Sequence, residues 1–439
     1  MKFTTFFLLF LGLGTQLCLA QSDPKVHAKD IVIKVLIDSL TNALNRIYIF
    51  PEKSILMSDH LKGQFKKGAY DKHLTDRKLL AEKISADIQS VHRDGHLRVN
   101  YDPAFAERLR AAPQESGMVD KNREVNKAKS ENFSFKKLEI LDGNIGYLQF
   151  SGFIGFIEEA KPTITAAFRF LANTDAIIID LRRNGGGSPW MVKQIASYLY
   201  AERTRLNDIY ERRKNETKEF WAEPEIAENM KLSMPLYILT SNNTFSAAED
   251  FTYAMQVNKR AVIVGDTTGG GAHPTGPVDI GQGFVVNIPF ARSINHITKT
   301  DWEGTGVLPD VAVPADQALV TAHQLALEAL LSKAQTPQEN KRLAWSLNAL
   351  KVHDYDESLD ISKLQRYVGK YGRFTISSKE NQFYLHDDDG SSYGLRPISG
   401  NLFLASEWMQ VEFLPDDGKA SSIRFIGKAG WEDVYTKTK

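Results

Sequence analysis

Ser246 is the residue whose type and position could do the most chemistry, because it stands where a buried strand gives way to a helix. The strand is predicted at Leu236–Thr240, an apolar run of strand length, and turn-forming residues separate it from Ser246. Backbone N–H groups at the start of a helix lack partners, so they could stabilise an oxyanion that forms beside the serine hydroxyl. The same serine could only cap the helix, since Ser246 and Glu249 fit the S-x-x-E capping box. The spacing alone leaves both interpretations open.

A second stretch that could contribute to a reaction is the glycine run Gly185–Gly187. It follows Ala176–Asp180, whose sequence AIIID is typical of a buried parallel strand. Glycine lets the backbone approach a substrate carbonyl closely, although the run could equally make a tight turn. Phosphate binding is disfavoured because no G-K-[ST] follows the glycines. The glycines and Ser246 both follow strand ends, which is where ligands collect in parallel sheets.

Strands and helices that alternate from Asn144 to about Lys333 must position these residues. This alternation predicts an α/β core with a mostly parallel sheet. Within it, Arg203–Met230 is polar and is predicted to be an excursion on the surface, and Phe284–Ile294 alternates like an exposed edge strand. The core is expected to carry Ser246 and the glycine run at one edge of its sheet.

The core lies between two parts of different character. A wide apolar stripe and a break at Pro51 predict helices over about Val26–Ser90. From Tyr367 onward, short alternating runs separated by turn residues predict a small antiparallel β domain. The predicted organisation is a signal peptide at 1–20, a helical N-terminal domain at 21–92, an α/β core at 93–333 with a partly helical polar connector at about 104–134, a helical linker at 334–354 and a β domain at 355–439.

Residues 1–20 have the form of a secretory signal peptide, in which Lys2 precedes a short apolar run and small residues end with Cys18 and Ala20. Cys18 is the only cysteine, so the mature chain would have no disulfide, catalytic thiol or cysteine-based zinc site. The apolar run is too short to span a bilayer comfortably. Lys+Arg and Asp+Glu balance at 54 each, which argues against a nucleic-acid partner. We expect an exported protein, periplasmic or extracellular, without a transmembrane segment after signal removal.

Four separated pieces of the sequence, read together, resemble the C-terminal-processing (tail-specific) serine peptidase family. They are DGHL at Asp94–Leu97, DLRRNGGG at Asp180–Gly187, NNTFSAAEDF with NKRAVIVGDTTGGG within Asn242–Gly271, and EGTGVLPDV at Glu303–Val311. Each piece alone is a weak signal, but their order and spacing cover roughly residues 30–333. The branch is similar to the tricorn-core peptidases and to interphotoreceptor retinoid-binding protein modules. The resemblance implies an α/β core like that of the crotonase and Clp-protease folds.

The resemblance also implies a serine peptidase that forms an acyl-enzyme on Ser246. Acyl transfer needs a nucleophile, a base and an oxyanion hole. The implied oxyanion donors are the backbone N–H groups of Ala247 and of Gly186 or Gly187. In this context we predict that the Ser246 hydroxyl is catalytic and that it can serve the helix start as well.

The base is where this chain departs from one branch of the family. In the bacterial processing peptidases the base is a lysine about 25 residues after the serine, and that position here is Gly271. In the tricorn-like branch a histidine in the segment equivalent to DGHL is the base, and His96 matches it. A neutral imidazole titrates near the working pH, which suits proton transfer from a serine. His273, two residues past the lysine position, is the competing candidate.

Further roles follow from the resemblance residue by residue. The tricorn pattern uses a serine before the histidine and a distant glutamate, and Gly95 replaces that serine. Glu303 is the best match to the glutamate, although it could equally bind the glycine-rich turn. Asp94 could orient His96 or only begin the turn. Arg182 or Arg183 could hold the terminal carboxylate of a substrate through two hydrogen bonds, or either could be a solvated surface residue.

The sequence therefore predicts a secreted serine hydrolase, a peptidase acting on peptides or proteins, with Ser246, His96 and Glu303 as catalytic residues. No metal and no cofactor is expected, and the sequence leaves the oligomeric state open. The alternative is a non-catalytic protein of the same fold that binds a hydrophobic ligand, as the retinoid-binding relatives imply. A third possibility is a binding module whose β domain docks cell-surface partners. A peptidase should need Ser246 and His96, whereas a binding protein should not.

Overall fold

The computed structural model describes residues 32–111, 117–228, 230–353, 365–380, 382–414 and 421–438. The predicted signal peptide at 1–20 lies outside these ranges. Within them, no helix combines the length and the apolar character needed to cross a bilayer.

A six-stranded sheet forms the centre of the molecule. Its strands, in spatial order, are β12 (Val311–Ala312), β8 (Val262–Gly265), β7 (Leu236–Thr240), β4 (Ala176–Asp180), β3 (Ile145–Phe150) and β2 (Phe135–Leu141). The pairs from β12 to β3 are parallel, and β2 joins the edge in antiparallel orientation. All residues of β4 and β7 are buried, which explains why their sequences are uninterrupted apolar runs. The predicted α/β core is thereby confirmed.

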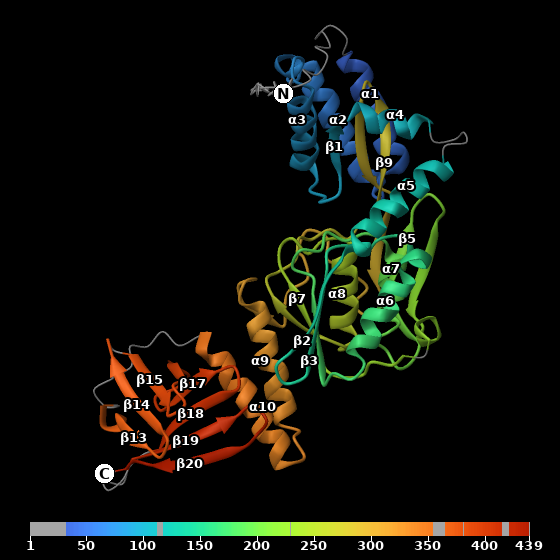
Figure 1. The fold of residues 1–439 in the computed structure, drawn as a ribbon. Coiled ribbons are helices and arrows are strands. Elements are labelled where there is room, and N and C mark those ends of the chain that lie inside the picture. The colour runs from blue at the N-terminus through green and yellow to red at the C-terminus, as the bar shows by residue number, and fades with distance from the viewer. Residues whose placement is uncertain are drawn as a thin grey trace, which may run out of the picture.

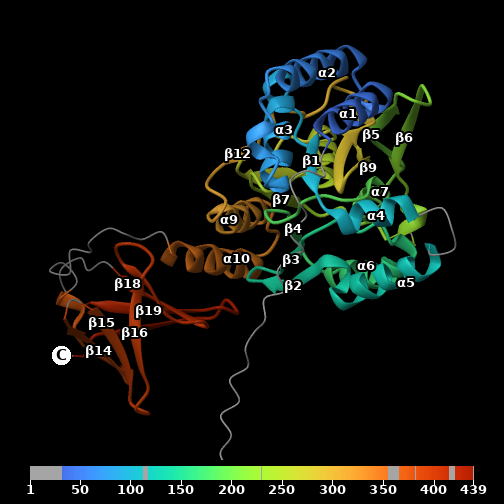
Figure 2. The same cartoon turned by 90° about the horizontal axis from the view of Figure 1, so that it is seen from above.

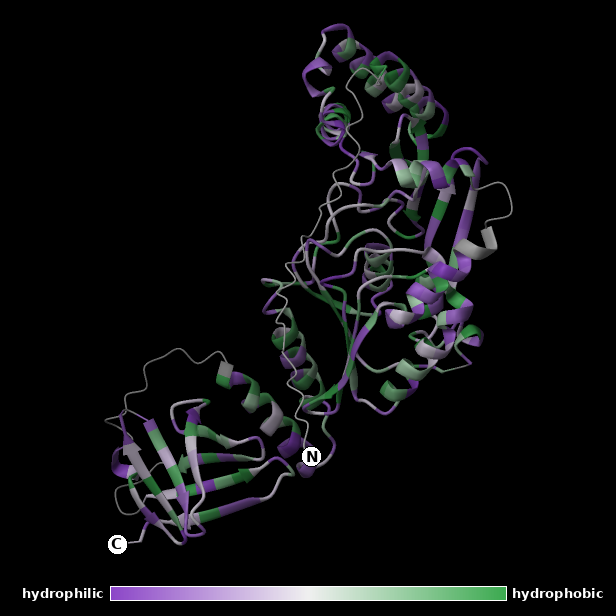
Figure 3. Cartoon of the chain, turned by 45° about the horizontal axis from the view of Figure 1, so that its top comes forward, coloured by the Kyte–Doolittle hydropathy of each residue, from purple (hydrophilic) through white to green (hydrophobic). Residues whose placement is uncertain are grey.

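Helices cover both faces of this sheet (Figure 1). On one face lie α6 (Ile157–Leu171), α7 (Pro189–Ala196) and α8 (Ala247–Val257); on the other lie α9 (Ala318–Leu331) and α10 (Pro337–Leu350). Successive side chains of a strand point to opposite faces. Accordingly Ile177 and Ile179 of β4 belong to the first apolar cluster, and Ile178 to the second. Hydrophobic residues gather in these central strands (Figure 3).

The N-terminal unit combines helices with strands from a distant part of the chain. The predicted helices are α1 (Ile33–Ile47), α2 (Pro51–Lys66) and α3 (Arg77–Val91). They pack on a three-stranded sheet in the order β1 (Arg98–Tyr101), β10 (Phe284–Pro289) and β9 (Thr275–Gly281), and one apolar core joins helices and sheet (Figure 2). The prediction of one exposed edge strand over Phe284–Ile294 is wrong. The segment breaks after Pro289, and β10 is the buried middle strand of the small sheet.

The two polar segments are more regular than the sequence indicates. The connector contains α4 (Pro103–Ala111) and α5 (Gly117–Ser130), in line with its predicted partial helicity. The segment Arg203–Met230 forms a hairpin of β5 (Thr204–Glu211) and β6 (Glu216–Ala222), to which β11 (Ala291–Asn295) adds a third strand. This hairpin is no purely surface excursion, because Leu206, Phe220 and Ala222 enter the main core.

The C-terminal domain is an antiparallel sheet of eight consecutive strands, as the alternating runs predict. They are β13 (Gly369–Tyr371), β14 (Phe374–Lys379), β15 (Gln382–Asp387), β16 (Ser392–Pro397), β17 (Leu402–Ser406), β18 (Met409–Leu414), β19 (Ser422–Gly427) and β20 (Glu432–Thr436). The N–H of Thr438 donates to the carbonyl of Lys370, so the last strand returns to the first and nearly closes a barrel. Aromatic and aliphatic side chains fill its interior. Helix α10 packs against it through Trp345, whose indole N–H donates to the Ile426 carbonyl at 3.1 Å (Figure 1).

Candidate active site

Ser246 lies at the sharp turn between β7 and α8, in a backbone conformation that few residues other than glycine adopt. Its φ is 55° and its ψ is −120°. A non-glycine residue with such angles costs roughly 1–3 kcal/mol and persists only where its surroundings hold it. The carboxylate of Glu249 accepts the Ser246 backbone N–H at 2.8 Å, and the carbonyl of Asn184 accepts the N–H of Phe245 at 3.0 Å. These contacts hold the turn and leave the Ser246 hydroxyl facing a cavity.

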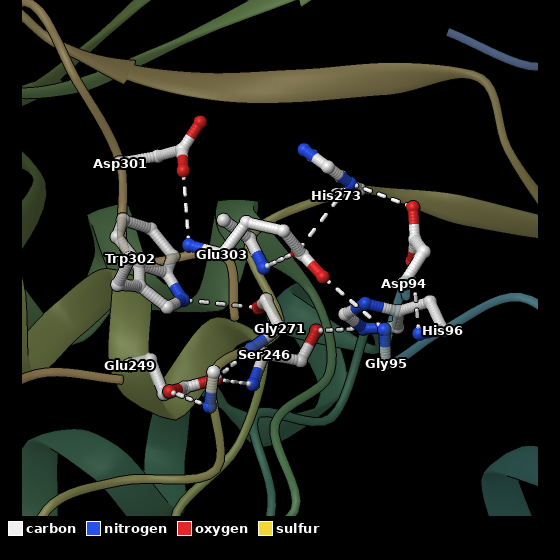
Figure 4. Close-up of polar contacts among 12 residues, drawn as sticks. Asp94, Gly95, His96, Ser246, Glu249, Gly271, His273, Asp301, Trp302 and Glu303 are labelled. Carbon is white, nitrogen blue, oxygen red and sulfur yellow. Dashed lines mark hydrogen bonds and ion pairs between the residues drawn. The ribbon is translucent and has the colours of Figure 1, made fainter. Parts of the chain in front are cut away.

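The imidazole of His96 meets this hydroxyl. His96 Nε2 lies 3.0 Å from Ser246 Oγ, a hydrogen-bond distance, although the residues come from the N-terminal unit and the core respectively (Figure 4). His96 follows α3 in the loop that leads into β1, and the N–H of His96 donates to Asp94 Oδ1 at 3.1 Å. Of the two histidines that the sequence offered as a base, His96 is the one in contact with Ser246.

His96 is held in its neutral form. Burial lowers the pKa of His96 to about 4; the charge of Asp94 opposes the shift and that of His273 adds to it. A neutral imidazole can accept the serine proton on Nε2 only if Nδ1 carries the ring hydrogen. Nδ1 is buried without a hydrogen-bond partner among the described residues, while oxygens of Asp94 and Glu303 lie within 4.8 Å of a His96 ring nitrogen.

Gly271, the position of the lysine in the processing peptidases, touches the same imidazole. A Cβ at Gly271 would lie 2.7 Å from His96 Cε1 and 2.2 Å from Phe245 Cζ. The His96 and Phe245 rings pack together with centroids 4.6 Å apart, so a Cβ at this position would displace both rings. The histidine therefore fills the space from which a side chain at position 271 would start.

Two backbone N–H groups are available beside Ser246. Gly187 and Ala247 both line the cavity, and no acceptor among the described residues takes either N–H. The N–H of Gly186 instead donates to Asn184 Oδ1 at 2.9 Å. A Cβ at Gly186 would come within 2.8 Å of Ala247 N, which explains why a glycine is needed beside the nucleophile turn. The geometry thus favours Gly187 over Gly186 as the partner of Ala247.

Behind His96 lies a second, buried group of polar side chains. Asp94 Oδ2 accepts hydrogen bonds from the Tyr48 hydroxyl at 2.9 Å and from His273 Nδ1 at 2.8 Å. Burial alone would lower the pKa of His273, but the hydrogen bond to Asp94 and the charges of Asp94 and Glu303 raise it above its ordinary value. Burial would likewise raise the pKa of Asp94, but the hydrogen bond and charge of His273 lower it. His273 and Asp94 therefore form an ion pair, and His273 does not face the Ser246 hydroxyl.

Glu303 joins the loops that carry the two histidines. Its Oε1 accepts the N–H of Gly95 at 3.1 Å, and its Oε2 accepts the N–H of Ala272 at 2.6 Å (Figure 4). Asp94, His96 and Glu303 also form a group whose potential metal-ligand atoms lie within 4.8 Å of one another. Both carboxylates already accept backbone N–H groups, and His96 Nε2 is turned to Ser246. The group is better arranged for proton transfer than for holding a metal ion.

Glu249 has a larger role than the capping box indicates. Besides the Ser246 N–H, its fully buried carboxylate accepts the Thr268 hydroxyl at 2.5 Å and the N–H groups of Gly270 and Gly271 at 2.7 and 2.8 Å. Burial raises the pKa of Glu249 despite these donors. One carboxylate thus ties the nucleophile turn to the glycine loop that touches His96. The S-x-x-E spacing was the only sequence signal for this residue, and it did not indicate the loop.

Arg182 and Arg183 are not brought to Ser246. The Arg182 guanidinium donates to both oxygens of Asp180, at 3.0 and 2.6 Å, and to the carbonyl of Ala315 at 2.6 Å. Arg183 is exposed. Both line a separate hollow with Asn242 and Asn243, and neither lines the cavity at Ser246 as the described residues define it.

The cavity at Ser246 has a volume of about 650 Å³. His96, Gly187 and Ala247 line it on the side of the hydroxyl, and the β5–β6 hairpin contributes apolar and charged side chains, among them Ile209 and Phe220. It is large enough to hold several atoms of a peptide side chain and its backbone beside the serine.

Two family models match successive parts of the chain. The model of peptidase family S41 matches residues 144–313, and the model described as the N-terminal domain of peptidase S41 in eukaryotic IRBP matches residues 25–137. Among curated proteins, carboxyl-terminal-processing peptidase 2, chloroplastic, of Arabidopsis thaliana is 28% identical over 181 residues, which is 39% of this chain and 32% of the relative. A carboxyl-terminal-processing protease of Synechocystis sp. is 28% identical over 182 residues, 40% of this chain and 39% of the relative.

The chain thus spans between a third and two fifths of the length of the curated relatives that it matches. Among solved structures, the photosystem II D1 C-terminal processing protease aligns with a TM-score of 0.43 and 17% identity, covering 65% of this chain and 94% of that chain. The two family models leave only a short interval between them and include the segments of Ser246, His96 and Glu303. By these matches, residues 144–313 are similar to peptidase family S41, and residues 25–137 are similar to the N-terminal domain described for that family.

Proposed function

We propose that this protein is a serine peptidase that cleaves peptides or proteins through an acyl-enzyme on Ser246. The observation that carries the proposal is the 3.0 Å contact between Ser246 Oγ and the neutral imidazole of His96. A serine used only as a helix cap would not need a buried imidazole at its hydroxyl. The carboxyl-terminal-processing peptidases among its relatives support a peptide substrate.

In the proposed reaction, Ser246 Oγ attacks the substrate carbonyl while its proton passes to His96 Nε2. The oxyanion that forms is stabilised by the N–H groups of Gly187 and Ala247, the latter at the positive end of α8. His96 then gives the proton to the leaving amine as the C–N bond breaks. Water, deprotonated by His96, releases the acyl group and returns Ser246 to its hydroxyl form.

A fluorophosphonate probe tests this proposal. An ordinary alcohol does not react with it, whereas an activated serine displaces fluoride and forms an Oγ–P bond. We expect a single label on the peptide that contains Ser246 and no label in Ser246→Ala. The free energy of unfolding of this variant should fall by no more than the loss of a helix N-cap costs, about 0.5–2 kcal/mol. A folded protein that neither the probe nor a peptide boronate modifies or binds near pH 8 would contradict the proposal.

A second experiment, an organic extraction of the purified protein, separates the peptidase from the hydrophobic-ligand binder. A binding protein should retain a lipophile that mass spectrometry detects in an organic extract, and Ser246→Ala should not alter that retention.

Export likewise belongs to the proposal, because it rests on residues 1–20. N-terminal sequencing of the mature protein should find a chain that begins near Gln21.

A further inference from the structure

A carboxyl group faces the cavity one helical turn beyond the nucleophile. Asp250 lies four residues after Ser246 on α8 and lines the same cavity. One turn of an α-helix rises about 5.4 Å, so the two side chains belong to one face of the helix and to neighbouring parts of the cavity wall. Nothing in the proposed acyl transfer uses this group.

Buried amides hold the Asp250 carboxyl in place. Asn207 Nδ2 donates to Asp250 Oδ1 at 2.6 Å and to the Asp250 carbonyl at 2.9 Å. The Asn207 oxygen in turn accepts from Asn295 Nδ2 at 2.7 Å, and the Asn295 oxygen accepts the N–H groups of residues 297 and 298. Asn207 is 2% exposed and Asn295 is 0% exposed. The chain of amides runs in one direction and orients the carboxyl as a prepared binding group.

No cation balances this carboxyl among the described residues. Arg205, on the strand that carries Asn207, pairs with Asp208 and Glu219. The two lysines that line the cavity are also engaged: Lys214 pairs with Glu211, and the Lys218 ammonium lies 3.8 Å from the centroid of the Trp190 ring. Burial raises the pKa of Asp250 to about 6, so the group is mostly ionised at neutral pH while it lacks a positive partner. Asp250 is half-buried and faces the cavity, so a cation that enters the cavity can pair with this unbalanced charge.

We propose that Asp250 makes this site selective for peptides with lysine or arginine as the residue whose carbonyl Ser246 attacks. The inference rests on the proposed peptidase function and names its substrate class. The ammonium or guanidinium group would pair with the free oxygen of Asp250. The methylene stem would pack along Ile209 and Phe290, which line the same cavity, as long basic side chains do on apolar surfaces.

Two peptidyl phosphonate diphenyl esters that differ in one side chain test the inference. One carries an aminobutyl group, as in lysine, and the other carries a butyl group, as in norleucine. With either probe, an Oγ–P bond forms on Ser246 as a P–O bond breaks, and the serine proton passes through His96 to the departing phenoxide. The wild-type protein should react at least tenfold faster with the lysine probe.

Asp250→Asn is nearly isosteric and keeps the oxygen that accepts from Asn207. It should slow the lysine probe tenfold or more and leave the norleucine rate within about threefold, which also reports that the site is folded. A probe with a glutamate side chain should react faster with this variant than with wild type. Asp208→Asn is the matched control, because Asp208 is a buried carboxyl on the same strand as Asn207 that already pairs with Arg205. It should keep the preference for lysine.

Equal rates of the two probes with wild-type protein would overturn the inference and leave the peptidase function standing. Loss of the preference in Glu211→Gln but not in Asp250→Asn would also overturn it, because Glu211 of the β5–β6 hairpin would then be the residue that binds the cation. If neither probe modifies Ser246, the peptidase function fails and the selectivity falls with it.

Discussion

The proposed chemistry depends on the histidine that faces Ser246. His96 Nε2 makes that contact at 3.0 Å, whereas His273 is paired with Asp94 behind it. His96→Ala should therefore lower the labelling or turnover rate by roughly a thousandfold or more, as loss of the base does in serine hydrolases. His273→Ala should cost far less, because it disturbs only the surroundings of Asp94. The comparison of the two rates is the measurement, and the reverse order would assign the base to His273.

The pH profile provides an independent check on His96. Because burial lowers its pKa to about 4, the base should stay unprotonated well below the ordinary range for histidine. The labelling rate of Ser246 should change little between pH 8 and about 5.5 and be lost only as the pH falls through about 4. A rate that halves near pH 6.5, the ordinary value for histidine, would contradict the structural account.

The same pKa shift should make the folded protein less stable in acid. Between the unfolded value of about 6.5 and the folded value of about 4, the unfolded chain binds a proton on His96 that the folded chain does not. This contribution therefore favours folding above pH 6.5 and is lost as the pH falls through that window. The labelling experiment should accordingly be accompanied by a measurement of folded protein at each pH.

Sequence motifs were sufficient to identify Ser246 and His96 as candidates, but not the hydrogen bonds around them. The choice between Gly186 and Gly187 depends on which N–H the side chain of Asn184 takes, and that follows from backbone angles. The expectation that His96 titrates near neutral pH also differs from the structure, because its burial results from packing against Phe245. Neither property is encoded in a motif.

Among the elements, the turn into α8 shows how one side chain can serve several segments. Glu249 is 0% exposed and accepts hydrogen bonds from Ser246, Thr268, Gly270 and Gly271. Glu249→Gln replaces an acceptor oxygen with an NH₂ group that faces these donors. We expect the free energy of unfolding to fall by about 2–4 kcal/mol, and Ser246 labelling to fall with it, because the turn and the loop at His96 lose their common support.

Helix α10 provides the matched control for this prediction. It begins with the same motif, since the N–H of Glu339 donates to the Thr336 hydroxyl and the Glu339 carboxylate accepts the N–H of Gln335. Glu339→Gln lies at the surface and should change the free energy of unfolding by no more than about 0.5 kcal/mol. Urea unfolding of the two variants makes the comparison. Equal effects would mean that Glu249 acts only as a helix cap.

Local patterns predicted most helices and strands, but not those formed by distant pairing. The buried strands β4 and β7 are continuous apolar runs, so their sequences indicate their type directly. The segment Phe284–Ile294 alternates as well, yet its first half pairs with β1 and β9 while its second half pairs with β5. Alternation reports which side chains are buried on one face, and it says nothing about which strand lies alongside.

In the whole molecule, the β domain lies beside α10 at one end of the core, and the N-terminal helices and β1 lie at the other end (Figure 1). Trp345 of α10 is 2% exposed and packs with Ile398 and Leu404 of the β domain. Trp345→Ala should lower the free energy of unfolding of the β domain, together with its contact to α10, by about 3–5 kcal/mol. It should leave the rate of Ser246 labelling unchanged in protein that remains folded. A melting curve followed in parallel with labelling tests this, and a large loss of labelling below the transition would show that the β domain supports the site.

The order of the parts along the chain was predictable, but their construction was not. The sequence indicates N-terminal helices, an α/β core and a C-terminal β domain, and all three are present. The N-terminal unit, however, includes β9 and β10, which are far from its helices in the sequence. His96 precedes β1 and His273 precedes β9, so both histidines lie in loops next to one small sheet. Only the three-dimensional structure shows that His96 and Ser246, the proposed base and nucleophile, come from different units.

The close approach of His96 to Gly271 limits how such a site can change over evolutionary time. Because a Cβ at position 271 would lie 2.2 Å from Phe245 Cζ and 2.7 Å from His96 Cε1, a lysine would fit there only if both rings shifted. Glycine at position 271 is therefore coupled to the positions of the Phe245 and His96 rings. Positions 96 and 271 are far apart in the sequence, yet we expect a side chain at 271 to be tolerated only together with a change that moves or removes these rings.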